Sequence, residues 1–442
     1  MLQTIELVEY ETKRVRSPAP SDADLKLAEA LSAFGDLAPR LKVRWLAGGR
    51  VEVTAGSWVG IVRFSSLEIR VVPKLVGGAY GVLRMLDYGS GVRLLARLPS
   101  DQQLPAGGTD LFELIVMLLV EETKSLLRGG LIRDYRSAEE TLSVMRGRLK
   151  MREQYLRRYG SLDRLECSFD EYDGDVPENQ LVAAALSAAG PRVQGLDLKA
   201  NTRKLDTLIR GVCNPTSVDA EWFRRRISYG RRNLRYRPAH ELALLVLDGL
   251  ALRDLFDTSS TTTNAFMLNM NVIFERFITR LVSESLQESN LRVSTQESFR
   301  TVIVDEDSGD TYSSVRPDLV IIDTVFGRAV PVDVKYKLYD RKKISPSDVH
   351  QLFLYAYVLT GDSEQRVGGI VYPSTRFTSG PRLKVKSIDG SSGAYIRGVG
   401  LDVPQALESL NTPAEQQLHI DVLSFVREMT GLHETSLVDA GK

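Results

Sequence analysis

The sequence predicts an α+β protein of several domains: a β-rich amino-terminal module, a mainly helical middle region and a carboxy-terminal α/β domain with a mixed central sheet. Its 442 residues exceed the roughly 100 to 200 that are typical of one domain. Short β-rich runs fill residues 43–75, and a Ser/Thr-rich segment at 259–264 precedes a region in which helical and strand patterns alternate. We therefore expect domains at 1–105, 106–258 and 259–442.

Composition indicates an ordinary globular protein with no global attraction to nucleic acid. Hydrophobic residues make up 43% of the chain and charged residues 26%, while Lys+Arg and Asp+Glu both number 57. Because the net charge is zero, any surface that binds DNA has to be local. Cys167 and Cys213 are too few for a disulfide framework or a four-cysteine zinc site, which favours a reducing compartment.

Neither the amino terminus nor the most apolar run of the chain indicates export or a membrane. The first fifteen residues, MLQTIELVEYETKRV, carry acids where a signal peptide needs a basic start and an apolar core. The run 111–120 contains Glu113 and has about half of the ~20 residues that span a bilayer. We expect a cytoplasmic protein with no membrane partner.

The middle region shows helical spacing and one strongly basic segment. Apolar residues recur at three and four over 109–129, 179–189 and 242–254. The basic segment, 224–238, interleaves arginines with Tyr229 and Tyr236. It could contact phosphates, or its arginines could pair with the many acids of the chain.

The carboxy-terminal domain begins with a predicted helix over 267–282. Its apolar stripe is flanked by Glu275, and it consists of Met270, Phe274, Phe277, Ile278 and Leu281. The alternating runs 299–304 and 311–315, joined by an acidic turn, then predict a β-hairpin.

The next stretch, RPDLVIIDTVFGRAVPVDVKYK, predicts two strands around a turn near Gly327. Asp333 and Lys335 are two residues apart in the second strand and therefore share one face. If the hairpin folds about its midpoint, Asp318 lies nearly opposite Asp333, close enough to share an ion. The pattern thus places two carboxylates beside one amine.

This arrangement suits hydrolysis of a phosphodiester. The reaction needs a divalent cation that lowers the pKa of the attacking water and neutralises developing charge. Asp318, Asp333 and Glu275 would form an adequate oxygen ligand set for Mg²⁺, with Mn²⁺ as a possible substitute. Lys335 would orient the water or stabilise the phosphate by its positive charge.

A second predicted helix follows, in SPSDVHQLFLYAYVLTG, and then a strand, VGGIVYPS. Gln351 and Tyr355 are four residues apart and share a helical face, from which they could orient Lys335, the water or a DNA phosphate. The order of helix, β-meander, helix and strand predicts an α/β sandwich with a mixed sheet.

These elements resemble the PD-(D/E)xK nuclease superfamily. The residues that carry the resemblance are Glu275, then Pro317-Asp318, then Asp333-Val334-Lys335, and finally Gln351 with Tyr355, which matches the QxxxY variant. The resemblance implies that Asp318, Asp333 and Lys335 are catalytic, with Gln351 and Tyr355 in support. Glu275 could instead form a surface ion pair with Arg276.

A narrower resemblance covers nearly the whole chain. The segments VGIVRF, LEIRVVPKL, GLIRDYR, MRGRL, EYDGDVPENQ, FMLNMNVIFERF, VPVDVKYK and GIVYPS are similar, in order, to the McrC family. Members of that family are nuclease subunits of modification-dependent restriction systems, partnered by the McrB AAA+ GTPase. The resemblance implies that this chain cuts foreign, methylated double-stranded DNA, assembles with a GTPase oligomer and stimulates its hydrolysis through the amino-terminal module.

GTP would reach this system only through the partner. No G-x-x-x-x-G-K-[ST] phosphate cradle occurs in the chain, and no cysteine-rich module or strongly basic recognition helix offers a place to read methylcytosine. Two alternatives stay open: a self-sufficient nuclease of the DNA-repair kind, and a non-catalytic activator of a GTPase with a vestigial nuclease site.

Overall fold

The computed structural model describes residues 3–32, 39–73, 75–92, 95, 110–161, 163–215, 217–250, 265–295, 298–340, 342–359, 365–386, 388 and 392–432. The chain forms two compact units, Met1–Leu95 together with Met267–Lys442, and Ala96–Phe266. Both units contain helices and strands, which confirms the α+β class. Most residues of the expected 1–105 module and 259–442 domain lie in the first unit, and the segment 259–264 lies outside the described residues.

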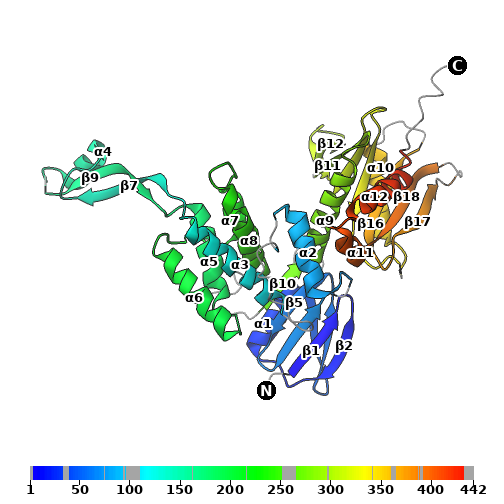
Figure 1. The fold of residues 1–442 in the computed structure, drawn as a ribbon, viewed down its shortest axis with the longest axis horizontal. Coiled ribbons are helices and arrows are strands. Elements are labelled where there is room, and N and C mark those ends of the chain that lie inside the picture. Colours follow the sequence, from blue (N-terminus) through cyan, green and yellow to red (C-terminus); the bar gives the residue numbers. More distant parts are fainter. Residues whose placement is uncertain are drawn as a thin grey trace. The chain divides into compact units, whose positions relative to one another are not determined.

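Two sheets occupy the amino-terminal part of the first unit (Figure 1). One has the order β1 (Gln3–Val8), β6 (Leu67–Val72), β5 (Trp58–Arg63) and β10 (Ala265–Asn269), and the other the order β2 (Thr12–Arg16), β4 (Arg50–Ala55) and β3 (Leu41–Leu46). The helices of this part are α1 (Asp22–Ser32) and α2 (Gly78–Ser90). β1 pairs in parallel with β6, and β3, β4, β5 and β6 confirm the strands expected over 43–75.

The predicted helix over 267–282 starts three residues too early. Residues 265–269 form β10, and α9 (Met270–Ser285) begins where the side chain of Asn269 accepts a hydrogen bond from the Asn271 amide, 3.0 Å away. The first four residues of β10 are all buried. Such a short continuous apolar run fits a buried strand as well as a helix, so periodicity could not separate the two.

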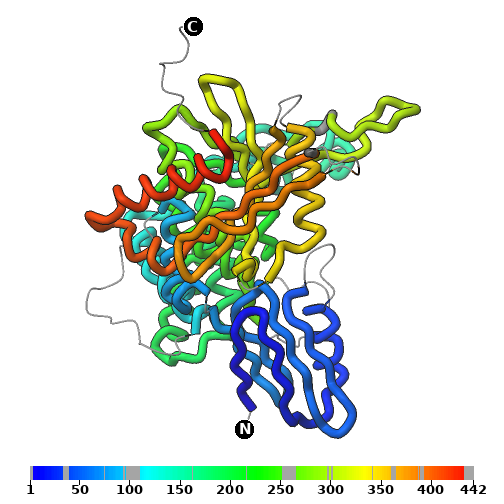
Figure 2. The backbone as a smooth tube through the Cα atoms, turned by 90° about the vertical axis from the view of Figure 1, so that its right-hand side faces the viewer, coloured from blue at the N-terminus to red at the C-terminus, as the bar shows by residue number. Residues whose placement is uncertain are grey.

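A six-stranded mixed sheet forms the carboxy-terminal part of the same unit. Its order is β11 (Leu291–Thr295), β14 (Leu319–Asp323), β15 (Ala329–Val334), β16 (Val367–Ser374), β18 (Ser392–Asp402) and β17 (Thr378–Lys386). β15, β16 and β18 run parallel, and the other neighbours are antiparallel. Figure 2 shows the orange strands β16 to β18 side by side. The predicted hairpin is also present, as β12 (Phe299–Val304) and β13 (Thr311–Val315).

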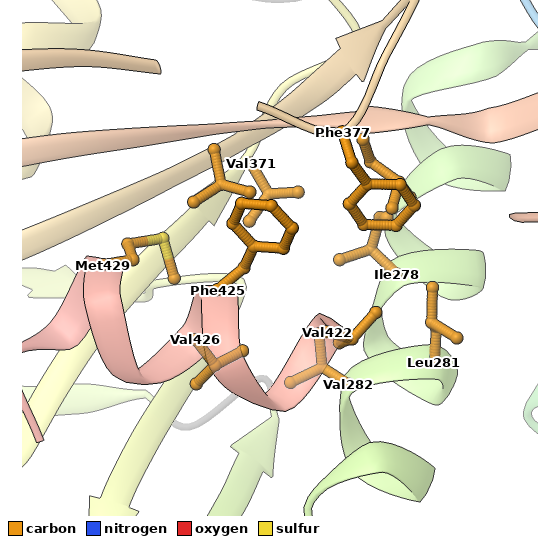
Figure 3. Close-up of a pocket in the computed structure, with 11 residues that line it drawn as sticks. Ile278, Leu281, Val282, Val371, Phe377, Val422, Phe425, Val426 and Met429 are labelled. Carbon is orange, nitrogen blue, oxygen red and sulfur yellow. The ribbon is translucent and has the colours of Figure 1, made fainter. Parts of the chain in front are cut away.

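Helices cover both faces of this sheet, as the sandwich prediction requires. They are α9, α10 (Pro346–Leu359), α11 (Val403–Ser409) and α12 (Glu415–Thr430). Ile370 and Tyr372 of β16 pack with Leu352 of α10. Val371, between them, points to the other face and lines an apolar pocket with residues of α9 and α12 (Figure 3). The lining of that pocket is entirely hydrophobic, so it offers no ligand for a metal or a phosphate.

The second unit is mainly helical but also contains a small sheet. Its helices are α3 (Leu111–Arg128), α4 (Met151–Arg158), α5 (Pro177–Ala189), α6 (Leu196–Arg210), α7 (Ala220–Arg224), the 3₁₀ helix η2 (Leu234–Tyr236) and α8 (Arg237–Leu250). The antiparallel sheet has the order β7 (Asp134–Leu142), β9 (Leu165–Asp173) and β8 (Arg148–Leu149). Residues 134–173, here named the arm, extend away from α5 and α6 in Figure 1.

The base of the arm is fixed by a buried hydrogen-bond network. The amide nitrogen of Asn179 donates to the carbonyls of Ile132 and Gly174, at 2.8 and 2.7 Å, which flank the two long strands. The hydroxyl of Tyr236 donates to the Asn179 side-chain oxygen and accepts from the Ile132 amide, both at 2.8 Å. All these groups are therefore satisfied without water, which holds both strands of the arm to α5.

In the basic segment 224–238, two arginines pair with acidic residues of the chain, as one of the two interpretations expects. Arg224 pairs with Asp248, Arg232 lies 3.1 Å from Asp134, and the tyrosine at 236 is wholly buried. Within the described residues, no helix combines the length and apolar character that a membrane span requires.

Candidate active site

The β14–β15 hairpin brings the two predicted aspartates together. Gly327 adopts a φ of 66° in the turn, a left-handed conformation that suits glycine. Leu319 pairs with Val332, and one further step in that register sets Asp318 opposite Asp333. The Asp318 carboxylate accepts a hydrogen bond from the Val334 amide, 2.7 Å away. The expected register is therefore the observed one.

Asp333 lies at the centre of this cluster and is only 1% exposed. One of its oxygens is 2.9 Å from the Lys335 ammonium. Among the residues that the structure describes, neither oxygen accepts a hydrogen bond of good geometry. Burial raises the pKa of Asp333 to about 7, and the neighbouring Asp318 adds to the rise while Lys335 opposes it. An ionised carboxylate that is buried with so few hydrogen bonds lowers the stability of the fold unless a cation binds to it.

Lys335 stays positively charged in this setting. Burial lowers its pKa, but the charges of Asp333 and Asp318 outweigh burial and hold the pKa above the ordinary value. Its side chain is 22% exposed. The group is thus a cation at neutral pH and is unsuited to act as a general base.

Gln351 and Tyr355 of α10 meet next to the hairpin. The Gln351 amide donates to the Tyr355 hydroxyl at 2.7 Å, and that hydroxyl donates to the Arg316 carbonyl at 3.2 Å. Burial raises the pKa of Tyr355, and the charges of Asp333 and Asp318 contribute to the rise. The predicted pair therefore shares a helical face and lies within electrostatic reach of both aspartates.

Glu275 of α9 is near the cluster but does not converge with it. Burial raises its pKa, with opposing contributions from Arg276 and Lys335. The carboxylates of Glu275, Asp318 and Asp333, all three of which are described, do not form a group in which every ligand atom lies within 4.8 Å of the others. A metal held by the two aspartates would thus reach Glu275 through a water more readily than directly.

Two residues that the sequence reasoning missed hold the segment after Lys335. Asp348 at the start of α10 accepts from the Lys337 ammonium at 2.6 Å and from the Tyr339 hydroxyl. This contact ties the segment to the helix that carries Gln351. Tyr336 is wholly buried. The alternation in VDVKYK indicated that Tyr336 faces inward, but nothing local identified its partners.

The donor set at the hairpin fits a hard divalent cation. Asp318 and Asp333 offer carboxylate oxygens, the ligands that Mg²⁺ and Mn²⁺ prefer, and neither Asp333 oxygen accepts a hydrogen bond of good geometry from the described residues. A second cluster, of Glu284, Glu415 and His419, has ligand atoms within 4.8 Å of one another. There, however, protein groups already satisfy the side chains, because Arg280 pairs with Glu284 at 2.7 Å and His419 bonds to Ser285. The hairpin is the better candidate.

Comparisons with known proteins identify the family and support the fold. A family model described as McrBC 5-methylcytosine restriction system component matches residues 53–373, which include the hairpin and α10. No curated protein sequence matches the chain.

Two solved structures from Thermococcus gammatolerans are similar to the chain. One is the half-complex from the tetradecameric assembly of McrB AAA+ hexamers with bound McrC, at 18% identity and a TM-score of 0.56 over 96% of this chain and 100% of that chain. The other is the cryo-EM structure of the McrBC complex, at 22% identity and a TM-score of 0.44 over 65% and 89%. These likenesses concern the fold, whereas the family match spans well over half of the sequence. The chain therefore belongs to the family of McrBC 5-methylcytosine restriction system components.

Proposed function

We propose that this chain is a Mg²⁺-dependent DNA endonuclease subunit of a McrBC-type restriction system. The observation that carries the proposal is Asp333, a buried carboxylate that lies opposite Asp318, has the Lys335 ammonium 2.9 Å away and accepts no hydrogen bond of good geometry from the described residues. A site built only for stability would supply donors to these oxygens.

The order of elements supports a PD-(D/E)xK nuclease domain. The helices that carry Glu275 and the pair Gln351 and Tyr355 both contact β15, the interior strand of the mixed sheet that carries Asp333. The resemblance read from the sequence therefore coincides with side chains that meet in space.

Each residue has a role that follows from its environment. Asp318 and Asp333 would hold Mg²⁺, with Glu275 in contact through a water, and the bound ion would activate the attacking water and neutralise charge on the phosphate. Lys335 stabilises the phosphate by its charge, since its raised pKa keeps it protonated. Gln351 and Tyr355 orient the substrate side of the site.

The partner is an McrB-type AAA+ GTPase oligomer. The similar structure with the higher TM-score describes McrC bound to McrB hexamers, and the match covers 96% of this chain. GTP acts only through that partner, and double-stranded, methylated DNA is the substrate. Zero net charge supports this division of labour, since a neutral chain gains little from counterion release on DNA.

The arm is a second candidate for the docking surface, beside the 1–105 module implied by the family resemblance. None of the eight residues of α4 is buried, and Tyr155 and Tyr159 are 64% and 79% exposed. Several charged groups of the arm are already paired, as Arg146 is with Glu171 and Arg158 with Glu166. Exposed aromatic side chains between paired charges suit a protein surface better than a phosphate backbone.

Two matched variants separate these docking surfaces. A double substitution on the arm, Tyr155→Ser with Tyr159→Ser, is compared with Leu25→Ser and Leu46→Ser in the module, all four side chains being exposed. Size-exclusion chromatography with the GTPase and GTP measures assembly, and a phosphate-release assay measures hydrolysis. If only one of the two double variants loses assembly and GTPase stimulation, its substituted residues mark the docking surface.

A magnesium titration tests the nuclease activity itself. The chain is mixed with its GTPase, GTP and methylated DNA, and single-turnover cleavage is followed from EDTA through millimolar Mg²⁺. Cleavage that rises with Mg²⁺ and requires the partner supports the proposal. Vigorous cleavage without the partner favours a repair-type nuclease, and GTPase stimulation without any cleavage favours a non-catalytic activator.

A further inference from the structure

The residue after the catalytic lysine is clamped by the amino terminus of the chain. The hydroxyl of the wholly buried Tyr336 donates to Glu9 at 2.8 Å, and the Tyr10 hydroxyl donates to the carbonyl of Tyr336. Glu9 and Tyr10 form the turn between β1 and β2, some 326 residues earlier in the chain. Tyr10 has a φ of 63°, a left-handed conformation that a non-glycine residue keeps only when its surroundings enforce it.

The amino-terminal part of the unit also contacts α9, the helix that carries Glu275. The buried Ser57 accepts hydrogen bonds at the start of α9, from the Asn271 side chain to its hydroxyl at 2.7 Å and from the Met270 amide to its carbonyl at 3.0 Å. One turn further along α9, the ring of Phe274 packs edge-on against Tyr336, with centroids 5.6 Å apart. Tyr336 therefore touches both the amino-terminal turn and the residue next to Glu275.

We propose that Glu9, Tyr10 and Tyr336 are positioning residues for the nuclease site, an inference that rests on the proposed function. The backbone at Lys335 is fixed on both sides, since its amide donates to the Val371 carbonyl at 2.9 Å and the next carbonyl accepts from Tyr10. A change in the β1–β2 turn would therefore move Lys335 relative to Asp333. Catalytic groups tolerate only about 0.5 Å of misplacement.

We call the contacts of Glu9 and Tyr10 with Tyr336 the clamp. Through the clamp, the geometry of the nuclease site depends on the amino-terminal module, although that module need not contact DNA or metal. Burial holds the pKa of Tyr336 well above its ordinary value, so its hydroxyl keeps the proton that it donates to Glu9. The interaction is a persistent charge-assisted hydrogen bond in a dry setting, which resists local rearrangement.

Tyr336→Phe tests the clamp because it removes the hydroxyl and keeps the ring against Phe274. We expect kcat of DNA cleavage by the assembled complex to fall roughly tenfold or more, as small misplacements of catalytic groups do, while KM for DNA and the GTPase rate stay within about twofold. Glu9→Gln retains an acceptor oxygen and should stay within about twofold of the parent, whereas Glu9→Leu should match Tyr336→Phe. If Tyr336→Phe does not fold, Tyr10→Phe replaces it in the test, and we expect the same fall in kcat because this variant removes the hydrogen bond to the Tyr336 carbonyl.

Tyr88→Phe is the matched control. The Tyr88 hydroxyl, on α2, donates to Glu284, which lies nine residues beyond Glu275 on α9, so this variant removes a similar buried bond between the same two regions of the unit. Its kcat should equal that of the parent once the folded fraction is matched. Equal losses in Tyr88→Phe and Tyr336→Phe, or parental kcat in folded Tyr336→Phe and Tyr10→Phe, would overturn the inference. Asp333→Ala is assayed in parallel: if the parent itself does not cleave, the proposed function fails, and if only Asp333→Ala is inactive, the clamp alone fails.

Discussion

Replacement of Asp333 by asparagine should stabilise the protein in the absence of metal. A pKa of about 7 in place of 3.8 means that the folded chain disfavours the ionised carboxyl, by an amount that corresponds to roughly 4 kcal/mol. Because the folded pKa is raised, the cost is absent below about pH 4, where both states are protonated. It grows as the pH rises to about 7 and is constant above that value.

The assay is urea denaturation in EDTA at pH 4, 6 and 8, followed by tryptophan fluorescence. We expect Asp333→Asn to raise the free energy of unfolding at pH 8 by up to roughly 4 kcal/mol and to change little at pH 4. Saturating Mg²⁺ at a hundred times its Kd should stabilise the parent by about 2.7 kcal/mol and leave the variant unchanged.

Asp323→Asn is the control for a structural aspartate. Asp323, at the end of β14, is also 1% exposed, but its carboxylate accepts the Val325 amide at 2.9 Å. This variant should lose stability at pH 8 and show no dependence on Mg²⁺. If Asp333 were instead one half of a structural ion pair with Lys335, Asp333→Asn would cost roughly 3 to 5 kcal/mol with or without metal, and our reasoning would be refuted.

Three further predictions concern substrate binding, catalysis and the arm. The purified chain alone should bind DNA no more tightly than micromolar at physiological salt, since its net charge is zero, and nanomolar binding in a filter assay would contradict this. Lys335→Ala should lower single-turnover cleavage by about 100-fold with calorimetric Mg²⁺ affinity within about twofold, and a large loss of affinity instead would make Lys335 part of the ion site. Asn179→Ala should lower the free energy of unfolding by about 1 to 3 kcal/mol, because the Ile132 carbonyl loses its donor and the Tyr236 hydroxyl its acceptor, and an unchanged urea midpoint would show that the base of the arm is held otherwise.

Local patterns were sufficient where a tight turn or helical spacing relates the residues of the site. The hairpin around Gly327 and the α10 helix with Gln351 and Tyr355 both follow from spacing alone. Both strands of the hairpin are almost wholly buried, so the register that sets Asp318 against Asp333 followed from the position of the turn near Gly327 and not from an alternation of apolar and polar residues. The pairing of Asp318 with Asp333 was therefore predictable, whereas the separation of Glu275 from that pair was not.

Other features could not be predicted because they lack such a pattern. β7 of the arm is exposed along nearly its whole length, so its sequence shows no alternation of apolar and polar residues. β10 is buried over its first four residues and joins a sheet whose other strands lie near the amino terminus. The contact of Glu9 with Tyr336 joins residues 327 positions apart, which no local pattern records.

The most direct test of the nuclease proposal is cleavage by the assembled complex with Asp333→Ala. The chain, its GTPase partner, GTP, Mg²⁺ and methylated DNA are combined, and cut ends are quantified against the parent chain in the same preparation. Complex formation and GTPase stimulation serve as controls for folding. Our account predicts that Asp333→Ala assembles and stimulates the GTPase normally but cuts at least about 1,000-fold more slowly, as expected when a metal ligand is lost. Cleavage at the parental rate by that variant would contradict it.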